Sequence, residues 1–370
     1  MKIENKYLMQ FHEIINAKYS LESDRPLMQK DSFPVNANFD SYLKKYDRNV
    51  LLPLQYNDLL NYSFANSVKD NKGKWTHWEN AIYEPDQLSD LHDHLIETFL
   101  MLKNNNQKEA LKNYRIESID FCEYGNSVPF RIKIIENITG KTDLFYVKLA
   151  DASRIYGLEL EHLLTENPIN FLYHQNTLVE EHIEGIPGDV FLEENIQLCS
   201  IDKTAVAKAF IQFNESCFVR LLGDMRSYNF VVNIVPLDNK NDFTIRAIDF
   251  DQQCYEGKKN LYYPQFYKEN VAFVEMVLQY CSTAEIKTQQ QIANALIISK
   301  IIKCRKQLMA LLNSMVLDEI SENYKIILLR TALNEHFKTN KFTACKTMGA
   351  IVKQQLKQLL QQEKLNLISH

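Results

Sequence analysis

The sequence predicts an α+β fold in which a small part built on an antiparallel sheet precedes a larger, mainly helical part. Between residues 115 and 149, short segments of alternating apolar and polar residues are separated by turn-forming residues, a pattern typical of antiparallel strands. After a Gly- and Pro-containing break at residues 184–188, apolar residues recur mainly at helical spacing. At 370 residues, the chain is long enough for two or three units with cores of their own.

The small part is expected to begin with three strands joined by tight turns, and to continue with one helix and two shorter strands. Glycine and polar neighbours mark the turns at residues 124–129 and 139–141. The predicted strands span residues 115–123, 130–137, 144–149, 170–173 and 177–182, and the predicted helix spans residues 153–165. We assign residues 113–184 to this part.

The helical part is assigned to residues 185–370, and residues 1–112 to an N-terminal extension whose role the sequence does not indicate. In the extension, apolar residues at helical spacing predict one helix over residues 85–104. In the helical part, the same spacing predicts helices over residues 203–214, 266–281, 284–315, 318–337 and 343–364.

Composition and charge exclude several classes of protein. The formal net charge is -5, so the chain has no basic excess to neutralise phosphates, and we expect no nucleic-acid partner. No long apolar run and no apolar signal core occur, which predicts a soluble protein without a membrane partner. The seven cysteines are scattered singly, as expected of reduced thiols, and we expect a cytoplasmic location.

One stretch, residues 221–251, carries more chemical content than the rest of the chain. Asp224 precedes Asn229 by five positions, an apolar strand follows, and a second apolar strand ends at Asp249. Phosphoryl transfer to a hydroxyl needs a carboxylate for the acceptor, and Mg2+ prefers hard oxygen ligands such as an amide oxygen and a second carboxylate. The three residues therefore predict a phosphoryl-transfer site.

The order of these pieces resembles the protein-kinase-like superfamily, and especially its branch of aminoglycoside-phosphotransferase-like and atypical small-molecule kinases. The similarity covers roughly residues 115–280 and depends on short motifs. It implies a bilobal fold, in which residues 113–184 form a nucleotide-binding small lobe and residues 185–370 form a mainly helical catalytic lobe. ATP and Mg2+ are the implied cofactors.

The resemblance implies a role for each polar residue of the motif. Asp224 would orient the acceptor hydroxyl and take its proton. Asn229 and Asp249 would bind Mg2+, and Asp251 is a second acidic candidate beside them. The loop is also similar to the Gly-Asp-Arg-His-x-x-Asn loop of phosphoinositide-type kinases, with Arg226 at the position of the histidine. Arg226 is expected either to stabilise the transferring phosphoryl group or to be a salt-bridged loop residue.

The resemblance also implies a nucleotide site in the small lobe. Lys148 would hold the inner phosphates, and a carboxylate on the following helix would fix the lysine. Glu159 and Glu161 are the candidates, and only one can face Lys148 because residues two positions apart on a helix point to different faces. The other candidates are the loop over the phosphates and the hinge whose backbone would bind adenine, namely Gly125, Asn126, Ser127, Glu181, His182 and Ile183.

The sequence departs from the family at three places. One glycine replaces the glycine-rich loop, Leu222 stands where kinases usually carry a histidine, and Asp-Phe-Asp replaces Asp-Phe-Gly. No Ala-Pro-Glu segment follows, which favours a small-molecule acceptor over a protein. We therefore predict an ATP- and Mg2+-dependent phosphotransferase acting on a hydroxyl of a small molecule. The alternatives are a non-catalytic nucleotide-binding scaffold, or a kinase-like enzyme that modifies a protein by phosphorylation or AMP transfer.

Overall fold

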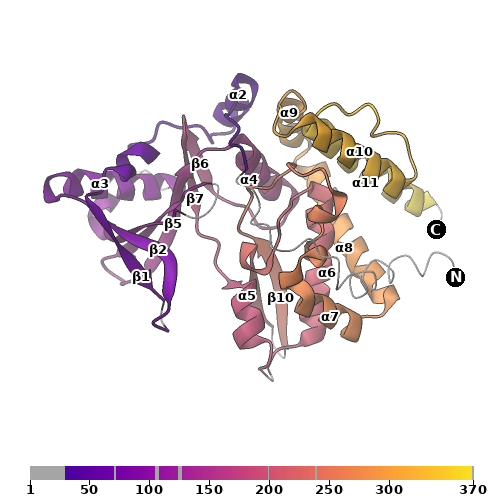
Figure 1. Ribbon diagram of the computed structural model, residues 1–370, viewed down its shortest axis with the longest axis horizontal. Coiled ribbons are helices and arrows are strands. Elements are labelled where there is room, and N and C mark those ends of the chain that lie inside the picture. Colours follow the sequence, from indigo (N-terminus) through magenta and orange to yellow (C-terminus); the bar gives the residue numbers. More distant parts are fainter. Residues whose placement is uncertain are drawn as a thin grey trace. The chain divides into compact units, whose positions relative to one another are not determined.

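The computed structural model describes residues 30–70, 72–104, 108–123, 127–198, 200–237 and 240–368. They form a mixed α/β structure with a seven-stranded antiparallel sheet and a helical region (Figure 1). The described chain divides into two compact units. The sheet unit comprises residues 30–155 and 169–182, and the helical unit comprises residues 156–168 and 183–368.

The sheet unit is built on the seven-stranded sheet, whose strand order is β1-β2-β3-β4-β5-β7-β6. All neighbouring strands run antiparallel. The strands are β1 (Phe64–Lys69), β2 (Trp75–Ile82), β3 (Tyr114–Phe121), β4 (Phe130–Glu136), β5 (Thr142–Leu149), β6 (Phe171–His174) and β7 (Thr177–Glu181). The five strands predicted between residues 115 and 182 are confirmed, and their ends differ from the prediction by at most two residues.

Strands β1 and β2 enlarge the sheet beyond the prediction, which assigned residues 1–112 to an N-terminal extension of unknown role. β2 pairs with β3 through Glu79 opposite Phe121 and Asn80 opposite Asp120, so this part of the chain shares the sheet of β3 to β5. Most side chains of β1 and β2 are exposed or half-buried. The two strands therefore lack the apolar alternation that marked the other five.

One face of the sheet carries the apolar core of this unit. The predicted N-terminal helix is confirmed as α3 (Pro85–Leu102), and its apolar side packs into this core. Phe99 of α3 contacts Phe145 of β5, with the ring centroids 5.7 Å apart. Because side chains alternate along a strand, Tyr146 and Lys148 lie on the opposite face.

The helical unit contains most of the helices and a small antiparallel sheet of order β10-β9-β8. The helices of the described chain are α2 (Ala37–Lys45), α3, α4 (Ala152–Leu164), α5 (Gly188–Val190), α6 (Lys203–Arg220), α7 (Val271–Tyr280), α8 (Thr283–Lys303), α9 (Arg305–Val316), α10 (Asn323–Phe337) and α11 (Met348–Ile368). The strands of the small sheet are β8 (Ile186–Pro187), β9 (Phe230–Leu237) and β10 (Lys240–Ala247). The first turn of α4 belongs to the sheet unit and the rest to the helical unit.

Short helical turns connect these elements. They are η1 (Tyr56–Leu60), η2 (Lys108–Asn113), η3 (Phe191–Asn195), η4 (Ser227–Asn229), η5 (Lys259–Tyr262), η6 (Pro264–Phe266) and η7 (Lys268–Asn270). The helix predicted over residues 284–315 is two helices, α8 and α9, which meet at Cys304. The apolar period continues across this junction, so periodicity alone joined the two helices.

Helix α6 leads directly to the predicted motif. Asp202 caps it by accepting hydrogen bonds from the N–H groups of Thr204 and Ala205 at 2.9 and 3.1 Å. The helix runs to Arg220 instead of residue 214, and it ends where Leu221 adopts a left-handed backbone with φ of 55°. No helix in the described part of the chain combines the length and the apolar character needed to cross a bilayer.

Candidate active site

Two adjacent segments of the helical unit carry Asp224 and Asp249. Asp224 lies in the loop of residues 222–229 between α6 and β9, and Asp249 follows β10. The N–H of Cys254 donates to the carbonyl of Leu221 at 2.9 Å. The chain after Asp249 is therefore tied to the chain before Asp224.

The backbone of Asp224 is held in an unusual conformation. Its φ is 55°, in the left-handed region that residues with a side chain rarely adopt. Its N–H donates to the hydroxyl of Tyr267 at 2.8 Å, and that hydroxyl donates to the carbonyl of Leu261 at 2.7 Å. This conformation costs about 1 kcal/mol or more at a residue with a side chain.

Arg226 and Asn229 contact Asp224 from within the same loop. The Nε of Arg226 donates to Oδ1 of Asp224 at 2.9 Å, and Nη1 of Arg226 donates to Glu269 at 2.7 Å. The Nδ2 of Asn229 donates to the carbonyl of Asp224 at 2.7 Å. Arg226 is therefore a salt-bridged loop residue, which is one of the two roles expected for it. Its contact with a phosphoryl group stays a prediction.

The surroundings of Asp224 change its acidity. Its pKa is raised to about 7, chiefly by burial; Arg226 opposes this shift, and the carboxylates of Asp249 and Glu269 add to it. The charge of Asp249 therefore acts on the carboxylate of Asp224. A carboxylate with a pKa near 7 is suited to take a proton at neutral pH.

Asn229 and Asp249 come together where β9 begins and β10 ends. The N–H of Ile248 donates to the carbonyl of Asn229 at 3.0 Å. The hydrogen bond from Nδ2 of Asn229 to the carbonyl of Asp224 fixes the orientation of the side-chain amide and does not use its oxygen. The N–H of Asp251 donates to Oδ1 of Asp249 at 3.0 Å and orients that carboxylate. Asp251 itself is buried.

The oxygen donors of Asn229 and Asp249 are of the kind that magnesium prefers. Among the described residues, no group of three or more His, Cys, Asp or Glu side chains is arranged to hold a metal ion. Mg2+ usually takes only one or two carboxylates from a protein when phosphates complete its shell. The amide oxygen of Asn229 and the carboxylate of Asp249 fit a site of that kind.

Lys148, in the sheet unit, forms a buried ion pair that the sequence did not predict. Its Nζ lies 2.7 Å from Oε2 of Glu180 on the neighbouring strand β7. Arg154 of α4 also binds Glu180, through Nε and through Nη2, the latter at 3.0 Å. Burial alone would raise the pKa of Glu180, but Arg154 and Lys148 lower it to about 2. Glu180 therefore stays ionised and fixes the lysine.

The two glutamates predicted as partners of Lys148 lie in the helical unit. The carboxylate of Glu161 forms a buried ion pair with Arg220 of α6, which makes it part of the interior of that unit. Glu159 is fully buried. Its pairing with Lys148 stays a prediction.

The phosphate loop is described only in part. Gly125 and Asn126 lie outside the described residues. Ser127 is buried, and its carbonyl accepts a hydrogen bond from the N–H of Leu149 at 3.2 Å. The end of this loop is therefore attached to β5 one residue after Lys148.

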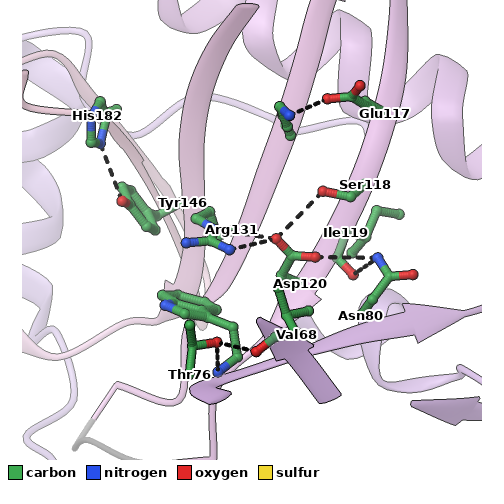
Figure 2. Close-up of polar contacts among 12 residues, drawn as sticks. Val68, Thr76, Asn80, Glu117, Ser118, Ile119, Asp120, Arg131, Tyr146 and His182 are labelled. Atoms are coloured by element: carbon green, nitrogen blue, oxygen red, sulfur yellow. Dashed lines mark hydrogen bonds and ion pairs between the residues drawn. The ribbon is translucent and has the colours of Figure 1, made fainter. Parts of the chain in front are cut away.

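The three residues predicted for the hinge have different surroundings. The N–H of Glu181 donates to the carbonyl of Asn170 at 3.1 Å, and adenine binding by another backbone group of Glu181 stays a prediction. The Nδ1 of His182 lies 3.1 Å from the hydroxyl of Tyr146 (Figure 2). Ile183 is buried. Adenine binding by the backbone of His182 and Ile183 stays a prediction.

A polar cluster that was not predicted lies on the face of the sheet that carries Tyr146 (Figure 2). The Arg131 guanidinium lies 4.3 Å from the ring centre of Trp78, and its Nη2 donates to Asp120 at 2.8 Å. Asn80 also donates to Asp120, at 3.2 Å. In the sequence, these residues could have been recognised only as polar positions of alternating strands. Which of them come together depends on how the strands pair.

Comparison of the chain with protein-family models gives no match, and comparison with curated protein sequences gives no significant match either. The geometry described above is therefore the basis for inferring a function.

Proposed function

We propose that the protein is an ATP- and Mg2+-dependent phosphotransferase with a protein-kinase-like fold, acting on a hydroxyl of a small-molecule acceptor. The observation that carries this proposal is the convergence of Asp224, Asn229 and Asp249 at one place in the helical unit. The order of elements supports it, because β3 to β5 are followed by α4, by β6 and β7, and then by the Asp224 loop.

Asp224 is the residue that would act on the acceptor. Its raised pKa lets it accept the hydroxyl proton near neutral pH, while the hydroxyl oxygen attacks the terminal phosphorus of ATP. Asn229 and Asp249 would hold Mg2+, which when bound neutralises phosphate charge and orients the nucleotide.

Lys148 would bind the inner phosphates of the nucleotide. A buried lysine needs a carboxylate to stay charged, and Glu180 supplies it at 2.7 Å. Arg154 binds both oxygens of Glu180, through Nε to Oε1 and through Nη2 to Oε2, so the position of the ammonium group is set before a nucleotide arrives.

ATP turnover with Mg2+ tests the proposal in the wild type and in Asp224→Ala and Asp249→Asn. Both variants are expected to lose turnover by at least about a hundredfold, because a general base and a metal ligand each contribute on this order. Asp242→Asn is the matched control, since Asp242 is exposed on β10. Equal turnover in all four proteins would contradict the proposal.

One observation favours the non-catalytic alternative. Oδ1 of Asp224 is already bound by Arg226, as in a loop that serves structure alone. A nucleotide-binding scaffold would show a thermal shift with ATP and Mg2+ and no turnover with any acceptor. Turnover abolished by Asp224→Ala would exclude it.

A further inference from the structure

The guanidinium of Arg226 is divided between two carboxylates. Its Nε donates to Oδ1 of Asp224 at 2.9 Å, and its Nη1 donates to Oε1 of Glu269 at 2.7 Å. A guanidinium commonly binds both oxygens of a single carboxylate through two parallel hydrogen bonds. Here the second bond goes elsewhere. Among the described residues, Oδ2 of Asp224 keeps only a long contact of 3.4 Å with Nδ2 of Asn229.

Glu269 is placed to hold Arg226 in this position. It lies in η7, the turn before α7, and 43 positions separate it from Arg226 in the sequence. Its Oε2 is buried and has no hydrogen-bond partner in the described part of the chain. In the described part of the chain, the carboxylate of Glu269 therefore forms its ion pair with Arg226.

Residues 267–270, which we call the clamp segment, also bind the backbone around Arg226. The hydroxyl of Tyr267 accepts the N–H of Asp224 at 2.8 Å, and its ring centre lies 5.2 Å from the Arg226 guanidinium. The side-chain amide of Asn270 donates to the carbonyl of Met225 at 2.8 Å. The clamp segment thus contacts three consecutive residues of the Asp224 loop.

On the basis of the phosphotransferase function proposed above, we propose that Glu269 is a positioning residue for the transfer. By drawing Nη1 of Arg226 away from Asp224, it leaves Oδ2 of Asp224 for the acceptor hydroxyl. Oδ2 takes the hydroxyl proton as the hydroxyl oxygen bonds to the terminal phosphorus, and the bond from that phosphorus to the bridging oxygen of ATP breaks, leaving ADP. Without Glu269, Arg226 turns both donors onto Asp224 and competes with the acceptor.

Steady-state kinetics of Glu269→Ala and Glu269→Gln test this role. We expect Glu269→Ala to lower kcat by about tenfold or more and to leave the KM for ATP within about twofold, because the loss affects the transition state and not nucleotide binding. Glu269→Gln keeps an acceptor for Nη1 and should recover part of kcat. The control is Glu275→Gln, an exposed glutamate on α7, which should match the wild type.

A double-mutant cycle shows whether Glu269 acts through Arg226. Lysine lacks the rigid, planar set of donors with which Arg226 binds Asp224 and Glu269 at the same time. In an Arg226→Lys background, Glu269→Ala should therefore have little further effect on kcat. Additive losses in the cycle would overturn the positioning role.

An NMR spectrum of protein labelled with 15N at the Nε of arginine reports on the surroundings of Arg226, and it does not require turnover. The Arg226 resonance is identified by its absence in Arg226→Lys, and it should shift in Glu269→Ala and stay in place in Glu275→Gln. If the wild type turns over ATP but the Arg226 resonance does not shift in Glu269→Ala, the positioning role of Glu269 is overturned and the proposed function is not. Unchanged kcat in Glu269→Ala has the same meaning. Absence of wild-type turnover overturns the proposed function and, with it, the role of Glu269 in transfer.

Discussion

The candidate chemistry depends on single side chains whose surroundings lower the stability of the fold. Asp224 combines a left-handed backbone, a carboxylate whose charged form is disfavoured by burial, and an ion pair with Arg226. Each of the first two features lowers stability, and burial of the charged form makes the carboxylate a better proton acceptor. Glu180 shows the opposite case, because two cations keep it ionised in spite of burial.

The pH dependence of turnover follows from Asp224. The residue must be ionised to accept a proton, and its pKa is raised to about 7, chiefly by burial. Turnover should therefore fall about tenfold for each pH unit below about 7. Rates measured between about pH 5 and about pH 9 test this. An acid limb near pH 4, the range of an exposed aspartate, would contradict it.

Stability should respond to Asp224 in the opposite sense. Because its pKa is higher in the folded state than in the unfolded chain, the stability linked to this group is present at low pH and is lost as the pH rises toward 7. Asp224→Asn should therefore raise the free energy of unfolding by roughly 1 to 3 kcal/mol above pH 7, and by little near pH 4. Denaturant titrations at the two pH values measure this, with Asp242→Asn as the control. Equal gains at both would contradict the linkage.

Pairing between secondary-structure elements brings together charged residues that lie on different segments of the chain. β5 carries Lys148, β7 carries Glu180 and α4 carries Arg154, and the three form one buried cluster in the sheet unit. In the sheet, Glu180 stands opposite Tyr146, two residues before Lys148. The lysine therefore reaches the carboxylate diagonally across the strand pair.

Glu180→Gln should be strongly destabilising, because it leaves the buried Lys148 and Arg154 without this counter-charge. We expect a loss of about 3 kcal/mol at neutral pH, which shrinks as the pH falls from about 4 toward 2, where Glu180 itself is protonated. Glu117→Gln is the matched control. Glu117 pairs with Lys133 on the same sheet (Figure 2), but both side chains are exposed, so the loss should be below about 1 kcal/mol. Equal losses in the two variants would contradict the assignment.

At the scale of the whole molecule, most of the described cysteines are shielded from solvent. Of the six described cysteines, five are buried and Cys304 is half-buried. Burial raises the pKa of Cys254 to about 12, so its thiolate is scarce at neutral pH.

Brief alkylation of the native protein should therefore modify Cys304 well before Cys217 or Cys254, because reaction needs an exposed thiolate. Peptide mass spectrometry measures the order, and the same reaction in denaturant is the control in which the rates should converge. Rapid labelling of Cys217 in the native protein would contradict the packing around α6.

Local pattern was sufficient for much of the fold and for finding the loop that carries the candidate site. Period-two alternation and turn residues predicted β3 to β7, helical spacing predicted α3, and the five-residue spacing of Asp224 and Asn229 marked the loop, because each of these signals lies within a short segment. The partners of those residues depend on contacts between distant segments. Glu180 as the partner of Lys148, and Tyr267 and Glu269 as the supports of Asp224 and Arg226, are 32 to 43 positions away, and only chain folding brings them within hydrogen-bonding distance.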